Sequence, residues 1–294
     1  MRCRSTLCLI VSAALCLAAA CSSADTAPVM ASVDLTPSRD RAPLGSPVDM
    51  TYAFDVEPGV SMPAGYRVLV HVVDDEGRVI WNDDHDPPLN TGEWTAGTPV
   101  RYTRTAFIPM IPFLGTATIR VGLYRDDERL RLRGPNEADN ESPAREYAVA
   151  TIDLLSQTES ILLVRGGGWH PVEFAADNPT REWEWTEKVA TLTFQNPKQD
   201  VTFSIESDAR PDAFEDPQQV TVRVGGTVVA QFAADQSVSI LRRMDIPAAL
   251  LGTDDRTEIQ IEVDKTFVPA ERPSGSTDTR VLGIRVYHAH VEVR

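Results

Sequence analysis

Short runs of alternating apolar and polar residues make up most of the chain from Ala31 onward, and they predict β-strands. A strand with one buried face turns every second side chain toward the core, so this period of two is typical of strands. The runs are rich in β-branched and aromatic residues and are separated by Gly, Pro, Asp and Asn, which favour turns. Patterns typical of amphipathic helices are nearly absent. The chain is therefore predicted to be all-β, with antiparallel sheets packed as sandwiches.

Three pairs of these runs predict β-hairpins. Their turns are at Glu76-Gly77, at the acidic segment 125–128 and at Gly225-Gly226. A two-residue Gly-Gly turn between alternating runs is a strong hairpin signal. The paired segments are 66–73 with 78–81, 116–124 with 129–133, and 220–224 with 227–232.

The predicted strands are too many for one small sandwich, and they divide into two groups. The polar stretch 134–145, which is rich in Asn, Glu and Pro, closes the first group before one last strand leads onward. We therefore predict an immunoglobulin-like β-sandwich at residues 31–155. A jelly-roll-like β-sandwich is predicted to follow at residues 156–294.

The start of the chain has the pattern of a secretion signal. Arg2 and Arg4 precede an apolar run at 7–17, and small residues at 18–20 precede Cys21. We predict a signal peptide at 1–20 and a lipidated cysteine with a flexible tether at 21–30. This stretch resembles the lipobox of bacterial lipoproteins. The resemblance implies diacylation of the Cys21 sulfur and a place in the bacterial cell envelope, on the periplasmic side or in the outer membrane. The alternative is an ordinary secretory signal peptide in which Cys21 has no role.

Cysteine positions and charge exclude several kinds of site. All 4 cysteines lie at positions 3, 8, 16 and 21, so removal of the predicted signal peptide would leave Cys21 alone. This excludes a disulfide, a thiolate zinc site and a cysteine nucleophile in the mature chain. The chain has 43 acidic and 28 basic residues, a net charge of −15, and no cluster of Lys and Arg. These features disfavour nucleic acid and anionic lipid surfaces as partners.

Four motifs in the second half occur in a characteristic order. They are Gly-Gly-Gly-Trp-His-Pro-Val-Glu at 166–173, Arg-Glu-Trp-Glu-Trp at 181–185, Asp-Lys-Thr-Phe-Val-Pro at 264–269 and Asp-Thr-Arg-Val-Leu-Gly-Ile at 278–284. Together they resemble a β-sandwich module that recurs in bacterial envelope proteins and at the ends of membrane-bound sugar transferases. In the first half, the segments 83–88, 91–94 and 121–124 resemble an immunoglobulin-like accessory domain of the same kinds of protein. Both resemblances imply a sugar-related setting without an assigned ligand.

The second half also supplies the candidate ligand-binding residues. Indole rings can pack on the C–H face of a sugar while charged side chains bond its hydroxyls. A competing interpretation is that Trp183 and Trp185, which share one face of a strand, fill the sandwich core. Similarly, Arg280 either positions a ligand with Asp278 or Asp264 or forms a structural ion pair. The candidates are Trp169, Trp183, Trp185, Arg181, Glu173 and Arg280, with Glu184 as a further carboxylate.

Two groups of residues could supply metal ligands. The loop at 83–86 holds three aspartates and His85, and His288, His290 and Glu292 share one face of the last predicted strand. The loop lacks the ligand spacing of a dedicated calcium site, and the strand alternation is that of any half-exposed strand. We therefore expect no metal and no other cofactor.

Enzyme motifs are absent from the sequence, including Gly-x-Ser-x-Gly, His-Glu-x-x-His and phosphate-binding glycine loops. The leading hypothesis is a non-enzymatic, lipid-anchored envelope protein acting as a carbohydrate-associated or interaction module. Its partners would be the membrane, through the lipid anchor, and a glycan or envelope proteins. One alternative is a structural or protein-binding lipoprotein that assists envelope glycan machinery. Another is a polysaccharide hydrolase, which needs two close carboxylates in a cleft. The sequence does not indicate an oligomeric state.

Overall fold

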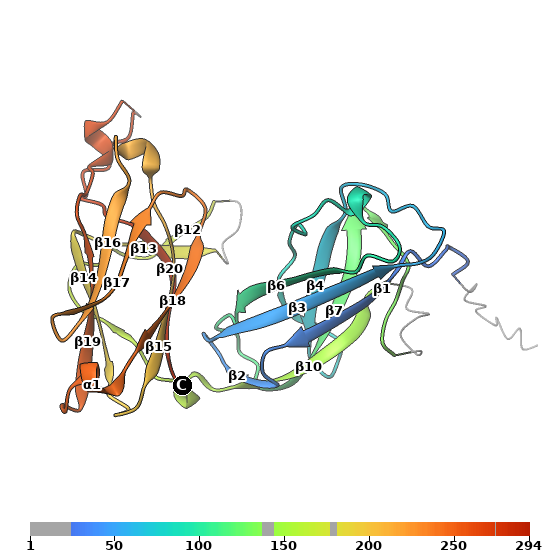
Figure 1. The fold of residues 1–294 in the computed structure, drawn as a ribbon, viewed down its shortest axis with the longest axis horizontal. Coiled ribbons are helices and arrows are strands. Elements are labelled where there is room, and N and C mark those ends of the chain that lie inside the picture. Colours follow the sequence, from blue (N-terminus) through green and yellow to red (C-terminus); the bar gives the residue numbers. More distant parts are fainter. Residues whose placement is uncertain (1–24, 137–143, 177–180, 274) are drawn as a thin grey trace, which may run out of the picture.

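The structure is a computed structural model that describes residues 25–136, 144–176, 181–273 and 275–294. It confirms the all-β prediction: two sandwiches, each with two sheets, follow one another along the chain (Figure 1). Within the described residues, no helix has the length and apolar character needed to cross a membrane. Cys21 and the predicted signal peptide lie outside the described residues, so lipidation stays a prediction.

The first sandwich has the immunoglobulin-like arrangement that the sequence predicted. One sheet has the order β6-β3-β1-β9, and the other has the order β2-β10-β7-β4-β5, with β8 paired to β7. As in immunoglobulin folds, the first strand is split, so that β1 joins one sheet and β2 runs parallel to β10 in the other. The strands are β1 (Ala31–Pro37), β2 (Arg41–Pro43), β3 (Pro47–Val56), β4 (Arg67–Val73), β5 (Val79–Asn82), β6 (Val100–Phe107), β7 (Gly115–Arg125), β8 (Glu128–Arg129), β9 (Leu132–Arg133) and β10 (Tyr147–Leu155), with a 3-10 turn η1 (Thr91–Glu93).

The second sandwich is a jelly roll, as predicted. Its sheets have the orders β11-β14-β19-β16-β17 and β12-β13-β20-β15-β18. If β13 to β20 are numbered one to eight, the orders are 1-8-3-6 and 2-7-4-5, which are those of two interleaved Greek keys. The strands are β11 (Val164–Arg165), β12 (Glu173–Phe174), β13 (Glu182–Trp185), β14 (Val189–Gln195), β15 (Val201–Asp208), β16 (Gln218–Val224), β17 (Thr227–Ala234), β18 (Ile240–Ile246), β19 (Arg256–Val263) and β20 (Arg285–Val293); the helical turns are η3 (Gln157–Glu159), η4 (Pro211–Ala213), α1 (Ala248–Leu251) and η5 (Pro269–Glu271).

Each sandwich has its own apolar core, and the second has an additional small cluster. The first core is built around Tyr52 and Phe54, and the second around Phe194 and Phe203. The additional cluster consists of Trp185, Ala213, Phe267 and Leu282, and it is separate from the core between the sheets.

A register shift divides β20 into two parts. Its pairing with β15 is irregular between Glu206 and Ser207, which leaves Tyr287 without an opposite residue. Val286 lies in the core, whereas Arg285 faces outward, and beyond the shift His288, His290 and Glu292 face outward. Unbroken alternation would place Tyr287 on the face opposite His288, but its hydroxyl donates to Asp208, the carboxylate that pairs with Arg285. A bulge of this kind inserts one residue and changes which side chains face out.

The two sandwiches meet along a small contact that we call the seam. On one side are Asp49, Thr105 and Phe107 of β3 and β6, and on the other are Arg243 of β18 and His288 of β20. The phenyl ring of Phe107 stacks on the imidazole of His288 with centroids 4.1 Å apart. The Arg243 guanidinium pairs with Asp49 at 2.6 Å and donates to the Thr105 hydroxyl at 3.1 Å. Figure 1 shows the first sandwich approaching the sheet that contains β15 and β18.

Candidate functional site

A cavity of about 570 Å³ lies on the outer face of the sheet that contains β13 and β20. Its position follows from the register, because Trp185 pairs with outward-facing Arg285 while the neighbouring Val286 is in the core. The walls come from β12 and β13, from η4 and from residues 267–273 and 276–282, which lie between β19 and β20. The aromatic and charged groups of the lining are three aromatic rings, four arginines and three carboxylates: Trp183, Trp185, Phe267, Arg210, Arg272, Arg280, Arg285, Glu173, Asp212 and Asp278.

An ion pair that is largely withdrawn from solvent forms the floor of this cavity. The Arg285 guanidinium donates from Nε to Asp208 Oδ1 at 2.7 Å, and the Asp208 side chain is fully buried. The hydroxyl of Tyr287 donates to the same carboxylate at 2.8 Å. Burial and this hydrogen bond raise the pKa of Tyr287 to about 12. The floor is therefore fixed by a carboxylate that accepts from two side chains.

Arg285 also supports both indoles of β13. Its guanidinium carbon lies 5.3 Å from the ring centroid of Trp183 and 5.5 Å from that of Trp185, within cation–π range. Trp185 is only 6% exposed and meets Phe267 edge to face at 5.7 Å. Trp183 is only partly buried, and its indole Nε1 donates to Glu173 Oε2 at 3.1 Å. The two indoles thus lie outside the main core: Trp185 anchors the small cluster, and Trp183 lines the cavity.

Arg280 forms ion pairs with two of the cavity's carboxylates. Its Nη2 lies 2.6 Å from both Asp278 Oδ2 and Glu173 Oε1. Hydrogen bonds from the side chain and backbone of Arg280 lower the pKa of Asp278 to about 2. Asp264, the other partner considered from the sequence, accepts from the backbone N–H of Gln219 at 2.8 Å. Arg280 therefore forms a structural ion pair and lines the cavity at the same time.

The η4 turn supplies the opposite wall. Arg210 donates to Asp212 from Nε at 3.0 Å and from Nη2 at 2.9 Å, and these hydrogen bonds lower the pKa of Asp212. Arg272, which follows η5, donates to the backbone carbonyl of Ala213 and, at 2.9 Å, to that of Asp212. Two separate turns are thereby joined through the Arg272 guanidinium.

Three of the other residues proposed from the sequence lie away from the cavity. The indole of Trp169 packs against the second core and donates to the carbonyl of Thr191 at 2.8 Å. Arg181 is exposed, with its guanidinium 5.0 Å from the ring centroid of Tyr287. Glu184 pairs with Arg165. Of the candidates, the structure brings together Glu173, Trp183, Trp185 and Arg280.

The sequence did not single out Arg210, Asp212, Arg272 and Arg285 as candidates. Each lies in a segment without a recognisable motif, so no pattern in the chain marks it. Phe267 lies within one of the quoted motifs, but its position in that motif did not indicate a role. The segments converge only through long-range pairing.

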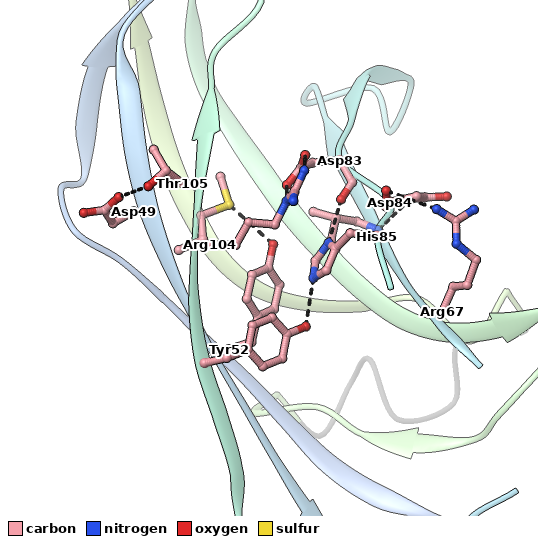
Figure 2. Close-up of polar contacts among 11 residues, drawn as sticks. Asp49, Tyr52, Arg67, Asp83, Asp84, His85, Arg104 and Thr105 are labelled. Atoms are coloured by element: carbon pink, nitrogen blue, oxygen red, sulfur yellow. Dashed lines mark hydrogen bonds and ion pairs between the residues drawn. The ribbon is translucent and has the colours of Figure 1, made fainter. Parts of the chain in front are cut away.

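The acidic loop at 83–86 is held by structural contacts (Figure 2). Asp83 accepts two hydrogen bonds from Arg104, at 3.0 and 3.1 Å, and Asp84 accepts from the backbone N–H of Val70 at 2.9 Å. His85 is buried and hydrogen-bonds the hydroxyl of Tyr102 at 2.8 Å, and burial lowers its pKa. The loop residues thus stabilise the first sandwich through contacts with neighbouring strands.

The polar residues on the outer face of β20 are either paired or buried. His288 Nδ1 lies 2.8 Å from Glu206 Oε2, and Glu292 pairs with Arg39 at 2.8 Å. His290, between them on the same face, is only 7% exposed. In the part of the chain that the structure describes, no three His, Cys, Asp or Glu residues are grouped so as to hold a metal ion.

Comparisons with known proteins give no family assignment. No family model matches the chain, and no curated protein matches it. Among solved structures, a Pseudomonas fluorescens alkylpurine DNA glycosylase is 12% identical, with a TM-score of 0.28, over 44% of this chain and 31% of that one. The CBM51-2 and INT domains of Clostridium perfringens ZmpB are 12% identical (TM-score 0.25; 60% and 37% covered). A CBM22-1–CBM22-2 tandem from Paenibacillus barcinonensis is 9% identical (TM-score 0.30; 85% and 80% covered).

The chain thus spans about a third of the length of the first two of these structures. At such identities and TM-scores, the likenesses carry no argument about function. The functional argument rests on the cavity itself.

Proposed function

We propose that this protein is a non-enzymatic glycan-binding protein and that the cavity on the outer face of the second sandwich is its binding site. The observation that carries the proposal is the pairing of a partly exposed indole, Trp183, with planar charged groups fixed by ion pairs. Sugar rings pack their C–H face on such an indole and exchange hydrogen bonds with such groups. Because the polar groups are already held in place, binding would cost little side-chain entropy.

The state of the cavity's carboxyl groups supports binding without hydrolysis. Glycosidic cleavage uses one carboxylic acid with a raised pKa beside a second, ionised carboxylate. In the cavity, hydrogen bonds from Arg210 and Arg280 lower the pKa values of Asp212 and Asp278. The third carboxylate, Glu173, accepts from the indole of Trp183 and pairs with Arg280.

The proposed cellular setting is the bacterial envelope. The lipobox-like segment ending in Cys21 supports attachment through a lipid. Residues 25–30 lie against the first sandwich, where Asp25 pairs with Arg145 and the carbonyl of Ala27 accepts from Arg131. Such an anchor would present the cavity to glycans of the envelope or to envelope components that carry glycans.

A protein partner is the second candidate function, and one feature of the fold favours it. Strand β12 lies at the edge of its sheet, beside the cavity, with Val172 and Phe174 exposed to 46% and 54%. An edge strand with exposed apolar side chains can pair with another chain. Crosslinking from membranes tests this candidate: we expect a reproducible protein partner that is lost on Phe174→Ser if the edge is an interface.

A glycan array tests the main proposal. The full-length chain would be applied in a detergent without a sugar head group, so that the detergent does not compete. We expect binding to a restricted set of glycans and a loss of at least tenfold in affinity for Trp183→Ala, about 1.4 kcal/mol.

The matched control is Trp81→Ala. Trp81 is also partly buried, but it packs against the core of the first sandwich. We expect this variant to bind glycans as the wild type does. Binding no greater than background, or equal affinities for wild type and Trp183→Ala, would contradict the proposed function.

A further inference from the structure

The charged groups around the cavity are equal in number but are not evenly paired. Four arginines and three carboxylates line it, and the buried Asp208 beneath the floor is a fourth carboxylate, although the chain as a whole carries a net charge of −15. Arg280 contacts two of these carboxylates, Asp278 and Glu173. One arginine is therefore left without a carboxylate partner.

The arginine without a carboxylate partner is Arg272. Arg280, Arg285 and Arg210 each form an ion pair with a carboxylate. Across the described residues, Arg272 has no carboxylate at ion-pair distance; the groups that it contacts are the backbone carbonyls of Ala213 and Asp212. The carboxylate of Asp212 is instead bonded to Arg210 by two hydrogen bonds.

The two carbonyl contacts orient the guanidinium without neutralising it. A guanidinium has five N–H donors. The carbonyls accept one hydrogen bond from Nη1 and one from Nη2, so other donors remain for a ligand. Arg272 is partly buried, so its charge is less screened than that of a fully exposed side chain. An oriented, unpaired arginine in a cavity is suited to an oxyanion, because its fork matches a carboxylate or an ester sulfate or phosphate.

We propose that the cavity binds an acidic glycan whose anionic group pairs with Arg272 while the sugar ring packs on Trp183. This inference rests on the proposed function, because it names the class of glycan that the same site would take. The shared chemistry is an oxyanion on a sugar, either the carboxylate of a uronic acid or an ester sulfate or phosphate. The overall negative charge of the chain does not oppose it strongly, since charges beyond about 8 Å are largely screened at physiological ionic strength.

Calorimetric titration with matched ligands tests the proposal. The probes are tetrasaccharides of galacturonic, glucuronic, mannuronic and guluronic acid, each with its methyl ester, together with neutral, sulfated and phosphorylated galactose oligomers. A methyl ester keeps the sugar and removes only the charge. We expect the full-length chain to bind at least one acidic probe tenfold or more tightly than its uncharged counterpart.

Variants of Arg272 connect that preference to the residue. We expect Arg272→Gln to bring the ratio of the two affinities to about one. Arg272→Lys keeps the charge but lacks the planar, paired N–H donors of a guanidinium. Its ratio of the two affinities should therefore lie between the wild-type ratio and one. Arg256→Gln, at an exposed arginine of β19 in the opposite sheet, is the control and should keep the wild-type ratio.

The outcomes separate this inference from the proposed function. Equal affinity of the wild type for charged and uncharged probes would overturn the inference and leave glycan binding intact, whereas no binding to any glycan would overturn both. Preference for uronates over sulfated or phosphorylated oligomers, or the reverse, identifies the source of the oxyanion. Thermal unfolding checks the fold of each variant. If Arg272→Gln does not fold, the proposal is tested by the affinity ratios of the wild type and of Arg272→Lys. An Arg272→Lys ratio equal to that of the wild type would contradict a role for the planar N–H donors of the guanidinium.

Discussion

The cavity and the seam lie on the same outer face of one sheet and use the same kinds of side chain for different ends. Both combine aromatic rings with arginines and carboxylates. In the seam, Phe107 stacks on His288 and Arg243 pairs with Asp49, so these groups have partners from the opposite sandwich. In the cavity, the partly exposed indole of Trp183 and the unpaired charge of Arg272 face a volume of about 570 Å³.

This difference shows how an outer sheet face can be divided between a structural contact and a binding site. The dividing point is the bulge of β20 at Tyr287, which directs Arg285 and Tyr287 to Asp208 on one side and His288 to Glu206 on the other. Bulges are common near functional sites because they redirect side chains. The unpaired guanidinium of Arg272, in contrast to the paired groups of the seam, is what indicates a ligand.

The largest expected effect comes from removing the buried carboxylate beneath the cavity. Asp208→Asn would leave the Arg285 guanidinium without its ion-pair partner in a largely buried position. We expect a loss of about 3 kcal/mol in the free energy of unfolding, measured with urea, because breaking one half of a buried pair leaves an uncompensated charge. Glycan affinity should also fall, since Arg285 supports both indoles.

Asp212→Asn is the matched control for this prediction. It also breaks an arginine–aspartate pair of the cavity, but the Asp212 side chain is 64% exposed. We expect it to cost less than about 1 kcal/mol, as exposed pairs do. Equal losses for the two variants would show that the Asp208 pair has no special role in the floor.

The next largest effect concerns the seam. Phe107→Ala removes the ring that stacks on His288 and should weaken the contact by about 1 kcal/mol, a typical value for an aromatic pair. We expect the radius of gyration from small-angle X-ray scattering to rise as the sandwiches move apart, with glycan affinity unchanged. Phe174→Ala, an exposed phenylalanine outside the seam, should leave the scattering unchanged. A Phe107→Ala profile identical to wild type would mean that the ring does not hold the sandwiches together.

Both sandwich folds could be predicted from the sequence because burial of one face of each strand imposes alternation. The region 220–232 shows this well: its alternating runs and Gly225-Gly226 turn correspond to the paired strands β16 and β17. The bulge at Tyr287 could not be predicted, because the residues around it keep the same alternation that an unbroken strand would have.

Only part of the candidate site could be predicted from the sequence. Glu173, Trp183 and Arg280 belong to motifs, and the structure places them in one cavity. Trp169 and Arg181 belong to the same motifs, yet they lie elsewhere: Trp169 packs against the second core, and Arg181 precedes β13 and is exposed. Arg285 meets Asp208 across 77 positions of sequence, so no local pattern could connect them.

The smallest expected effect is a dependence of the seam on pH through His290. This residue lies on the face of β20 that meets the first sandwich, and burial lowers its pKa below the ordinary value of 6.5. The unfolded chain therefore binds more protons than the folded one as the pH falls below about 6.5, so acidification in this range lowers stability. Glu206 does not contribute to the loss of stability in this pH range. Burial would raise its pKa, but hydrogen bonds from His288 and Ser239 lower it overall below 4.5, so its contribution is lost only at more acidic pH.

Urea unfolding at pH 7.5 and pH 5.5 measures this effect when wild type is compared with His290→Gln. One proton can contribute at most about 1.4 kcal/mol per pH unit, and we expect a fraction of that. The variant should lose less stability than wild type between the two pH values, because it has no imidazole to protonate at this position. Identical losses would show that His290 accepts its proton equally well in the folded and unfolded chains. In that case the first sandwich would not withdraw this part of the sheet from water. The seam would then be open to water, as the cavity is.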